Sequence, residues 1–374
     1  MEPNCRKSYN DSFSEEAYQS YVNEINEIGN GQLDFRIAET PVFVSKEMKS
    51  MLLEAGEAIL DFLASDTFLE ISKENNPHSL HWSDMLVMDF GICKTEEGNI
   101  EPRLIELQGF PSLFAFEFFQ DLTLRKHFDI PNHFSSYLNG YSSTEYRQLL
   151  HNIIIGSENP ENVILLELFP DKQKTRIDFH CTEKLLSIKT VCITTLSKEG
   201  DTLYYHNNDK KILIKRIFNR VIPDEWEKHK NLLSFNPFED NGIVWLNHPS
   251  WYYSISKQLL PFIESRYAPA AFFLDELTTP LPLEKYVLKP LFSYAGTGVV
   301  LSPSQETLNA IVNPHEWILQ EKMEYANIVA TPDMPAKTEI RLFYFCKKEW
   351  SRPKAIHNLA RISKGAMIGT RYNK

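Results

Sequence analysis

The chain has no run of apolar residues long enough to cross a membrane, and it does not open with the basic start and apolar core of a secretion signal. A membrane-spanning helix needs about 18 or more consecutive apolar residues. We therefore expect a protein that is neither secreted nor embedded in a membrane. The sequence also contains no internal repeat and no low-complexity tract.

The chain has few cysteines, and their spacing does not suggest pairs. The five cysteines are an odd number, lie far apart and form no C-x-x-C pair. This pattern argues against a disulfide framework and favours reduced thiols, which predicts a cytoplasmic protein.

Basic residues are fewer than acidic ones. Lys and Arg total 39 against 50 Asp and Glu, which gives a net charge of −11 and argues against broad binding to nucleic acids or anionic membranes. With 374 residues, 43% apolar and 24% charged, the composition is that of a soluble globular protein of two or three lobes.

The two common nucleotide-binding motifs are missing, but residues 286–301, YVLKPLFSYAGTGVVL, offer another phosphate site. An apolar run ends at Lys289, and a loop of small residues follows before apolar residues resume at Val299. The pattern predicts strand, loop and strand, with loop N–H groups able to cover phosphates and the lysine supplying positive charge. Because the lysine precedes the glycines, this is not a P-loop. The alternative is a hairpin turn beside a surface lysine.

Acidic residues gather on a second predicted hairpin. MLVMDFGI (85–92) and PRLIELQG (102–109) are strand-like and flank the turn TEEGN (95–99). Symmetry about the Glu97–Gly98 bond puts Asp89 opposite Glu106, with Gln108 on the same face. Opposed side chains lie about 5 Å apart at Cβ, where two carboxylates repel unless a cation lies between them. Their oxygens suit Mg²⁺ carried with phosphates, whereas the alternative is solvated acids on an exposed face.

The remaining pattern is mixed. Residues 1 to about 78 are predicted to be mostly helical, with Ser45 capping a helix through Leu63. Residues 152–247 alternate strand and helix, which predicts a small parallel-sheet lobe. Its basic residues Lys215, Arg216 and Arg220 suit either an anionic substrate or a solvated edge.

Two more strands follow near the C-terminal end. KTEIRLFYF (337–345) carries Glu339 and Arg341 on one face, and PKAIHNLARIS (353–363) carries Arg361. An exposed ion pair is the alternative explanation for Glu339 and Arg341.

The order of these residues resembles the ATP-grasp fold, particularly the bacterial glutathione synthetase pattern. The resemblance rests on Lys257 in NHPSWYYSISKQLL, Lys289 in VLKPLFSYAGTGV, Gln320 in ILQEKMEY, Glu339 and Arg341 in EIRLFYF, and Arg361 in NLARIS. The family's C-terminal metal-binding module is absent from the end of the chain and is found instead as Asp89 followed by IELQGFPS. This order resembles the circularly permuted ligases, such as eukaryotic glutathione synthetase and glutathionylspermidine synthase.

The resemblance covers residues 81–110 and 152–374 and implies an α/β protein with a circularly permuted ATP-grasp fold. The implied divisions are an N-terminal helical cover (1–80), the permuted metal-binding part (81–150), a small Rossmann-like lobe (151–250) and the nucleotide-binding lobes (251–374). Two departures are Gln108, where the family has asparagine, and a loop with fewer glycines than many relatives.

The resemblance also implies a function: ligation of a carboxylate to an amine, with ATP and one or two Mg²⁺ ions, through an acyl-phosphate. The implied metal ligands are Asp89, Glu106 and Gln108. The implied catalytic residues are Lys289, Arg341 and Arg361, and the implied ATP contacts are Lys257, Lys289, Ser293, Ala295, Gly296, Thr297, Gly298, Gln320, Glu321, Lys322, Met323 and Glu339. The substrates are expected to be small-molecule or peptide acids and amines. The alternatives are a phosphotransferase and a nucleotide-binding module without catalysis; the oligomeric state is left open.

Overall fold

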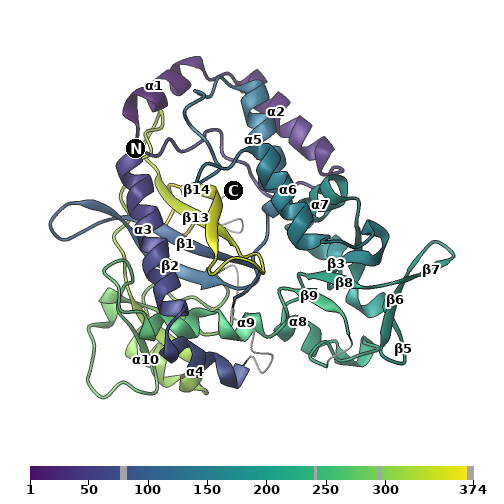
Figure 1. The fold of residues 1–374 in the computed structure, drawn as a ribbon. Helices are drawn as coiled ribbons and strands as arrows, with labels where there is room; N and C mark the ends of the chain where they lie inside the picture. Colours follow the sequence, from purple (N-terminus) through teal and green to yellow (C-terminus); the bar gives the residue numbers. More distant parts are fainter. Residues whose placement is uncertain (76–81, 240–241, 294–295, 369–374) are drawn as a thin grey trace.

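The protein is a mixed α/β molecule with several separate sheets, and the computed structural model describes residues 1–75, 82–239, 242–293 and 296–368 (Figure 1). The helices are α1 (Pro3–Ser12), α2 (Glu15–Ile28), α3 (Lys46–Leu63), α4 (Asp66–Asn75), α5 (Phe114–His127), α6 (Ser143–Ile154), α7 (Arg176–Leu186), α8 (Pro223–Glu227), α9 (Trp251–Ser254) and α10 (Gln305–Asn309).

A four-stranded antiparallel sheet in the order β14-β13-β1-β2 lies at the centre (Figure 1). Its strands are β1 (Met85–Lys94), β2 (Ile100–Gln108), β13 (Lys337–Phe345) and β14 (Lys354–Ser363). Strands from early in the sequence therefore pair directly with strands from its end.

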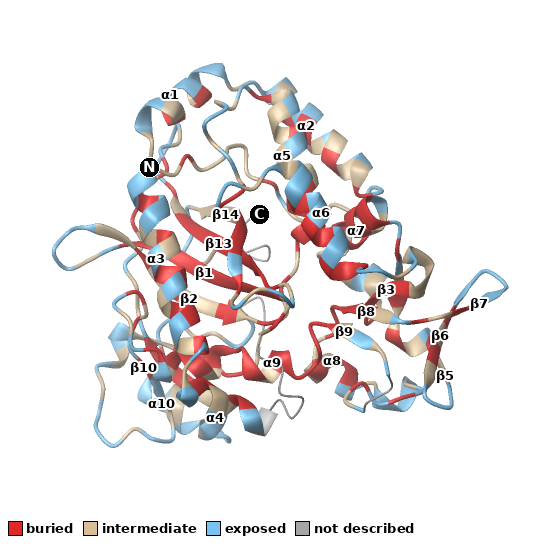
Figure 2. Ribbon diagram, in the orientation of Figure 1, coloured by how far each residue is buried: buried red, intermediate tan, exposed pale blue. Residues whose placement is uncertain are grey.

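Strand β1 is buried on both faces because helices cover the central sheet on each side (Figure 2). Its even-numbered residues, such as Met88 and Phe90, pack in one apolar cluster with the inner face of α3. Met85 and Val87, on the other face, pack in a second cluster with residues of α2, α5, α6 and α7. On the odd-numbered face of β1, the side chains of Met85 and Val87 are therefore apolar, and that of Asp89 is polar.

The second sheet is parallel, in the order β4-β3-β8-β9. Its strands are β3 (Val163–Glu167), β4 (Lys189–Cys192), β8 (Arg216–Asn219) and β9 (Val244–Leu246). Every residue of β3 is buried, as expected for an apolar run covered on both faces. The small parallel sheet predicted for this region is confirmed.

Two three-stranded antiparallel sheets complete the described architecture. The first has the order β10-β12-β11, with β10 (Ala271–Phe273), β11 (Tyr286–Pro290) and β12 (Trp317–Glu321). The second, β5-β6-β7, has β5 (Ser197–Glu199), β6 (Thr202–Asn207) and β7 (Lys210–Leu213) and projects from the parallel sheet (Figure 1).

The first hairpin contains a β-bulge. On the turn side, Lys94 pairs with Ile100, so the turn is centred on Glu97 rather than on the Glu97–Gly98 bond. The register shifts between Phe90 and Asp89, which makes Ile105 the extra residue, and Asp89 then pairs with Glu106 as predicted.

One local prediction differs from the structure. The strand expected after the small-residue loop reduces to a single bridge between Leu288 and Val300. Lys257 begins a 3-10 helix, Lys257–Phe262, which follows the end of α9 at Ser254. The Ser45 cap is confirmed, because its hydroxyl accepts a hydrogen bond from the Met48 amide at 3.3 Å.

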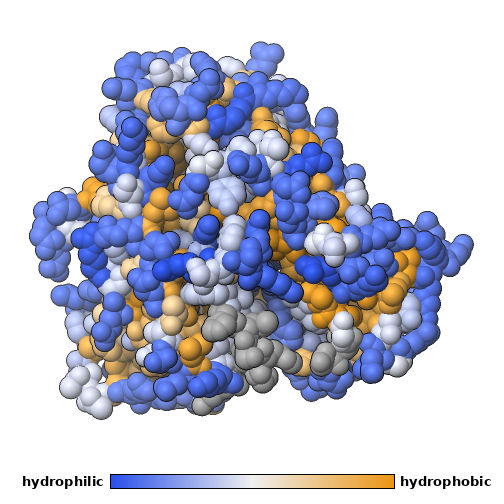
Figure 3. Space-filling model, in the orientation of Figure 1, coloured by the Kyte–Doolittle hydropathy of each residue, from blue (hydrophilic) through white to orange (hydrophobic). Residues whose placement is uncertain are grey.

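Within the described residues, none of the helices has the length and apolar character needed to span a membrane. The face shown in Figure 3 is mostly hydrophilic, with apolar areas scattered among the charged residues.

Candidate functional site

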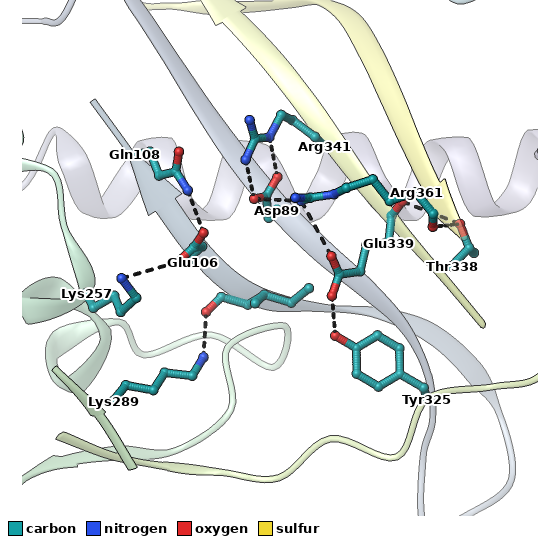
Figure 4. A network of polar contacts seen from close by, with 11 residues as sticks. Asp89, Glu106, Gln108, Lys257, Lys289, Tyr325, Thr338, Glu339, Arg341 and Arg361 are labelled. Carbon is teal, nitrogen blue, oxygen red and sulfur yellow. Dashed lines mark hydrogen bonds and ion pairs between the residues drawn. The ribbon is translucent and has the colours of Figure 1, made fainter. Parts of the chain in front are cut away.

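One face of the central sheet carries a row of polar residues from all four strands (Figure 4). Asp89 on β1 pairs with Glu106 on β2 and with Arg341 on β13. Glu339 pairs with Arg361 on β14. Directly opposed residues project from the same face, so five residues that are far apart in the sequence share one surface.

Asp89 is clamped by two arginines. Arg341 Nε and one terminal nitrogen donate to its two oxygens at 2.7 Å each, and Arg361 donates to Oδ2 at 2.9 Å. The side chain of Asp89 is only 2% exposed. Burial alone would raise the pKa of Asp89, but the two guanidinium groups outweigh it and hold the pKa below its usual value.

Glu339 joins this cluster to a tyrosine. Its Oε1 accepts from the Tyr325 hydroxyl at 2.7 Å, and its Oε2 lies 3.5 Å from Arg361. Burial raises the pKa of Glu339 above its usual value, although Arg361 and Tyr325 oppose this shift. Gly91 leaves room for the tyrosine, since a Cβ there would lie 2.9 Å from Tyr325 Cε1.

Lys289 is a buried cation beside this row. It is 7% exposed, and its Nζ donates to the carbonyl of Ile105 at 3.2 Å and to Gln320 Oε1. The bulge explains the first contact, because the extra residue of a bulge leaves the regular strand pairing. Burial lowers the pKa of Lys289 to about 8, although Glu106 opposes the shift. Among the described residues, no carboxylate lies within ion-pair distance of it.

Lys257 lies close to the second strand. Its Nζ is 3.4 Å from Glu106 Oε2 and donates to the Ser293 carbonyl at 2.6 Å and hydroxyl at 3.2 Å. Gln108 donates to the other oxygen of Glu106. The structure therefore brings together Lys257, Lys289, the acid–amide pair Glu106 and Gln108, and Ser293 at the start of the loop.

The predicted adenine segment divides in two. Gln320 is 1% exposed, and its amide donates to the Leu104 carbonyl at 3.4 Å. Glu321 is exposed, and Lys322 instead binds the Glu284 carbonyl and Ser302. Met323 is half-buried. Of these four residues, Gln320 is the one with a described hydrogen bond to Lys289.

The predicted phosphate loop is partly described. Gly296 and Gly298 have φ values of +71° and +77°, a conformation that favours glycine. Thr297 is exposed between them, and Ala295 lies outside the described residues.

The described contacts fit a magnesium ion at only part of the predicted ligand set. Both Asp89 oxygens are held by arginine. Gln108 turns its nitrogen toward one Glu106 oxygen, and the other Glu106 oxygen lies 3.4 Å from Lys257, so the Gln108 amide has to rotate before both residues offer oxygens to one ion. No cluster of three or more His, Cys, Asp or Glu suited to a metal occurs among the described residues. Mg²⁺ binds through one or two protein oxygens when phosphates complete its shell, so Glu106 and Gln108 would suffice as its protein ligands, whereas Asp89 already binds two arginines.

The basic residues of the parallel-sheet region have separate roles. Lys215 pairs with Glu158 at 2.9 Å, and Arg216 donates to the carbonyls of Ile153 and Ile154. Arg220 is 8% exposed and donates to the Phe110 and Pro111 carbonyls just after β2. Arg220 therefore ties the parallel sheet to the loop that leaves the site.

Two contributors were not anticipated. Tyr325 follows β12 in a segment with no periodic pattern, so the sequence around it does not predict a role in the site. In the folded protein its hydroxyl contacts Glu339. Asp178 on α7 accepts from the backbone amides of Leu113, Ala115 and Phe116 and so caps α5. A cap supplied from another helix leaves no local signal in the sequence.

Comparisons with known proteins identify the fold. No protein-family model matches the chain, and a search of the curated proteins also finds no match. Among solved structures, the chain is similar to a glutathione synthetase-like effector, GSS30, from Globodera pallida, determined in the apo form. The two are 11% identical with a TM-score of 0.57, and the match covers 92% of this chain and 94% of the other. The chain therefore has a glutathione synthetase-like fold.

Proposed function

We propose that the protein is an ATP- and magnesium-dependent ligase that joins a carboxylate to an amine through an acyl-phosphate. The carboxylate oxygen would attack the γ-phosphorus of ATP and release ADP. The amine nitrogen would then attack the acyl carbon, lose a proton and release inorganic phosphate.

The observation that carries this proposal is the burial of Lys289 with no carboxylate of the described residues within ion-pair distance. Its described hydrogen-bond partners are a carbonyl and an amide oxygen, and Lys257 lies in the same cluster. Lys257 and Lys289 bring two positive charges to this cluster against the one negative charge of Glu106, so a negatively charged ligand would be favoured there. A polyphosphate is such a ligand, with loop amides from Ser293 and Gly296 to Gly298 covering it.

The acid–amide pair is the proposed metal site. Glu106 and Gln108 would hold Mg²⁺, whose positive charge would neutralise the phosphate oxygens during transfer. In this proposal Asp89 holds Arg341 and Arg361 in position rather than binding the metal.

Arg361 is the better candidate of the two arginines for contact with the reacting carboxylate. Arg341 commits two nitrogens to Asp89, whereas the Arg361 side chain is 24% exposed and contacts Asp89 and Glu339 through a single terminal nitrogen. A guanidinium stays charged and offers a planar fork of donors, which suits a carboxylate or acyl-phosphate.

The pairing of β1 with β13, with β2 on the other side of β1, supports the circularly permuted ATP-grasp arrangement as part of the same proposal. In this arrangement β10, β11 and β12 form the nucleotide lobe, with Gln320 at the adenine side and Glu339 near the ribose.

The test is an ATP-dependent phosphate-release screen over pairs of amino acids and short peptides, with the product mass measured. A new amide product requiring both partners supports the ligase. A stable phosphorylated product with no amine requirement would favour a phosphotransferase instead.

A nucleotide-binding module without catalysis is the second candidate. It is favoured by the ion pairs of Asp89 with two arginines, which occupy a predicted metal ligand. ATP binding without phosphate release across the whole screen would support it over the ligase.

A further inference from the structure

A cavity of about 1190 Å³ lies beside the edge strand β14, and its lining includes residues of α1, α5 and the segment 35–49. Small-molecule pockets are usually about 300–1,000 Å³, so an extended ligand fits. Arg361 and Asn358 are in its wall. The cavity therefore reaches the arginine end of the candidate site.

Helix α5 turns one side toward this cavity. The wall includes Leu113, Phe116, Glu117, Gln120, Asp121 and Leu124, which recur at helical spacing. Among them Glu117 is a buried acid, only 4% exposed. A carboxyl at such a position needs a partner or becomes neutral.

The described partner of Glu117 is a neutral amide. With the Gln120 side chain oriented to satisfy its neighbours, its nitrogen donates to Glu117 at 2.8 Å and its oxygen accepts from Tyr21 at 3.1 Å. No cation among the described residues lies within ion-pair distance of Glu117. By contrast, Asp121, one turn further along, is paired with Arg125 at 3.2 Å.

A buried acceptor with no described partner lies in the same wall. His357 is 1% exposed, and its Nδ1 lies 2.8 Å from the Asn358 carbonyl. A carbonyl only accepts, so Nδ1 donates; burial lowers the pKa of His357 to about 4, which leaves the ring neutral and Nε2 an acceptor. Nε2 has no described partner, and neither does the hydroxyl of Tyr137, whose ring lies 4.7 Å from the imidazole.

We propose that this cavity binds the amine substrate, with its ammonium group held by Glu117 and with His357 available to accept a further N–H. The inference rests on the proposed ligase function and names where its second substrate enters. The nitrogen would then lie on the same side of the sheet edge as Arg361, next to the activated carboxylate.

The first test measures binding without ATP. n-Butylamine, which is an ammonium ion at neutral pH, and butanoate, its acid counterpart, are titrated calorimetrically into the full chain. We expect the amine to bind and the acid not to bind. Glu117→Gln should weaken amine binding by about tenfold or more, since hydrogen bonds to charged groups are among the strong ones.

The matched control is Asp121→Asn, which removes the same charge from the same helix. It should leave amine binding within about twofold, because Asp121 already has Arg125 as its partner. Equal losses in the two variants, preference for butanoate, or no amine binding would each overturn the proposal.

A readout on the unaltered protein covers the case in which Glu117→Gln does not fold. Burial and the carboxylate of Asp178 raise the pKa of Glu117, which favours its protonated form. Binding an ammonium ion would stabilise the carboxylate, so a proton should be released, measured as a dependence of the binding heat on buffer ionisation. The charged groups that act on Glu117 are Asp178 on α7, Asp121 on α5, Arg341 on β13 and Arg361 on β14. Amine binding without proton release would place the ammonium elsewhere.

The outcome is separable from that of the ligase proposal. Amine binding at Glu117 with no ATP-dependent phosphate release would reject the ligase and keep the amine site. ATP-dependent amide formation that is insensitive to Glu117→Gln would keep the ligase and reject this site.

Discussion

Replacing Lys289 with methionine should make the free protein more stable and, at the same time, weaken its binding of nucleotide. The lysine is almost fully buried without a carboxylate partner, and burial lowers its pKa from 10.5 to about 8. A fall of this size corresponds to roughly 3 kcal/mol held against the charged form in the folded state. Methionine keeps the apolar stem and removes the charge.

The pH dependence carries a definite sign. Between about pH 8 and 10.5 the unfolded lysine keeps its proton while the folded one loses it, so the unfolded state binds more protons and stability rises with pH. Below about pH 8 the full penalty is present. The stability advantage of Lys289→Met should therefore be greatest near pH 7 and shrink as pH rises through this window.

The assay is denaturant unfolding at several pH values from 7 to about 10, with Lys285→Met as the control, because Lys285 is exposed just before the same strand. Nucleotide affinity with Mg²⁺ is measured by calorimetry. A charge-assisted contact to phosphate contributes about 1.5–3 kcal/mol, so affinity should fall by about tenfold to a hundredfold. A variant that is less stable at pH 7, or that binds nucleotide as well as the wild type, would refute the reasoning.

Three further changes test other parts of the site. Glu106→Ala should abolish magnesium-dependent phosphate release while nucleotide still binds, and full turnover at saturating Mg²⁺ and substrate would remove Glu106 from the metal site. Asp89→Asn should lower the free energy of unfolding by about 3–5 kcal/mol at neutral pH, because it removes the carboxylate that pairs with Arg341 and Arg361. Since the pKa of Asp89 is held below its usual value, this difference should shrink as acid protonates the wild-type carboxyl; a loss that is constant down to low pH would contradict it. Gly91→Ala should lower the unfolding free energy by about 1–3 kcal/mol, since the added methyl meets the Tyr325 ring, and crystallography should find that ring displaced from Glu339. An unmoved ring would contradict this account.

Much of the strand framework was predictable because alternation and apolar runs are local signals. The range 337–345 predicted for one strand matches β13, and the Asp89–Glu106 pairing was found from hairpin symmetry alone. The turn is centred on Glu97, half a residue from the predicted centre at the Glu97–Gly98 bond. The bulge at Ile105 shifts the pairing by one residue, so that Asp89 still lies opposite Glu106.

The contacts of the site were not predictable in the same way. The double clamp on Asp89 depends on which strand lies beside β1, and no local pattern encodes that neighbour. The cavity beside β14 likewise depends on how α1 and residues 35–49, which lie far from β14 in the sequence, pack near that strand. The ATP and metal assignments stay predictions until nucleotide binding is measured.

The pairing of β1 with β13 also affects how the chain is made. Asp89 and Arg341 are 252 positions apart, so a growing polypeptide completes its first hairpin long before the strand that belongs beside it emerges from the ribosome. Until then one long apolar edge and a carboxylate destined for the interior stay exposed, and such intermediates aggregate readily. A nascent chain halted shortly before residue 341 should therefore depend on chaperones, and a product truncated there should be degraded rather than accumulate as a smaller folded protein.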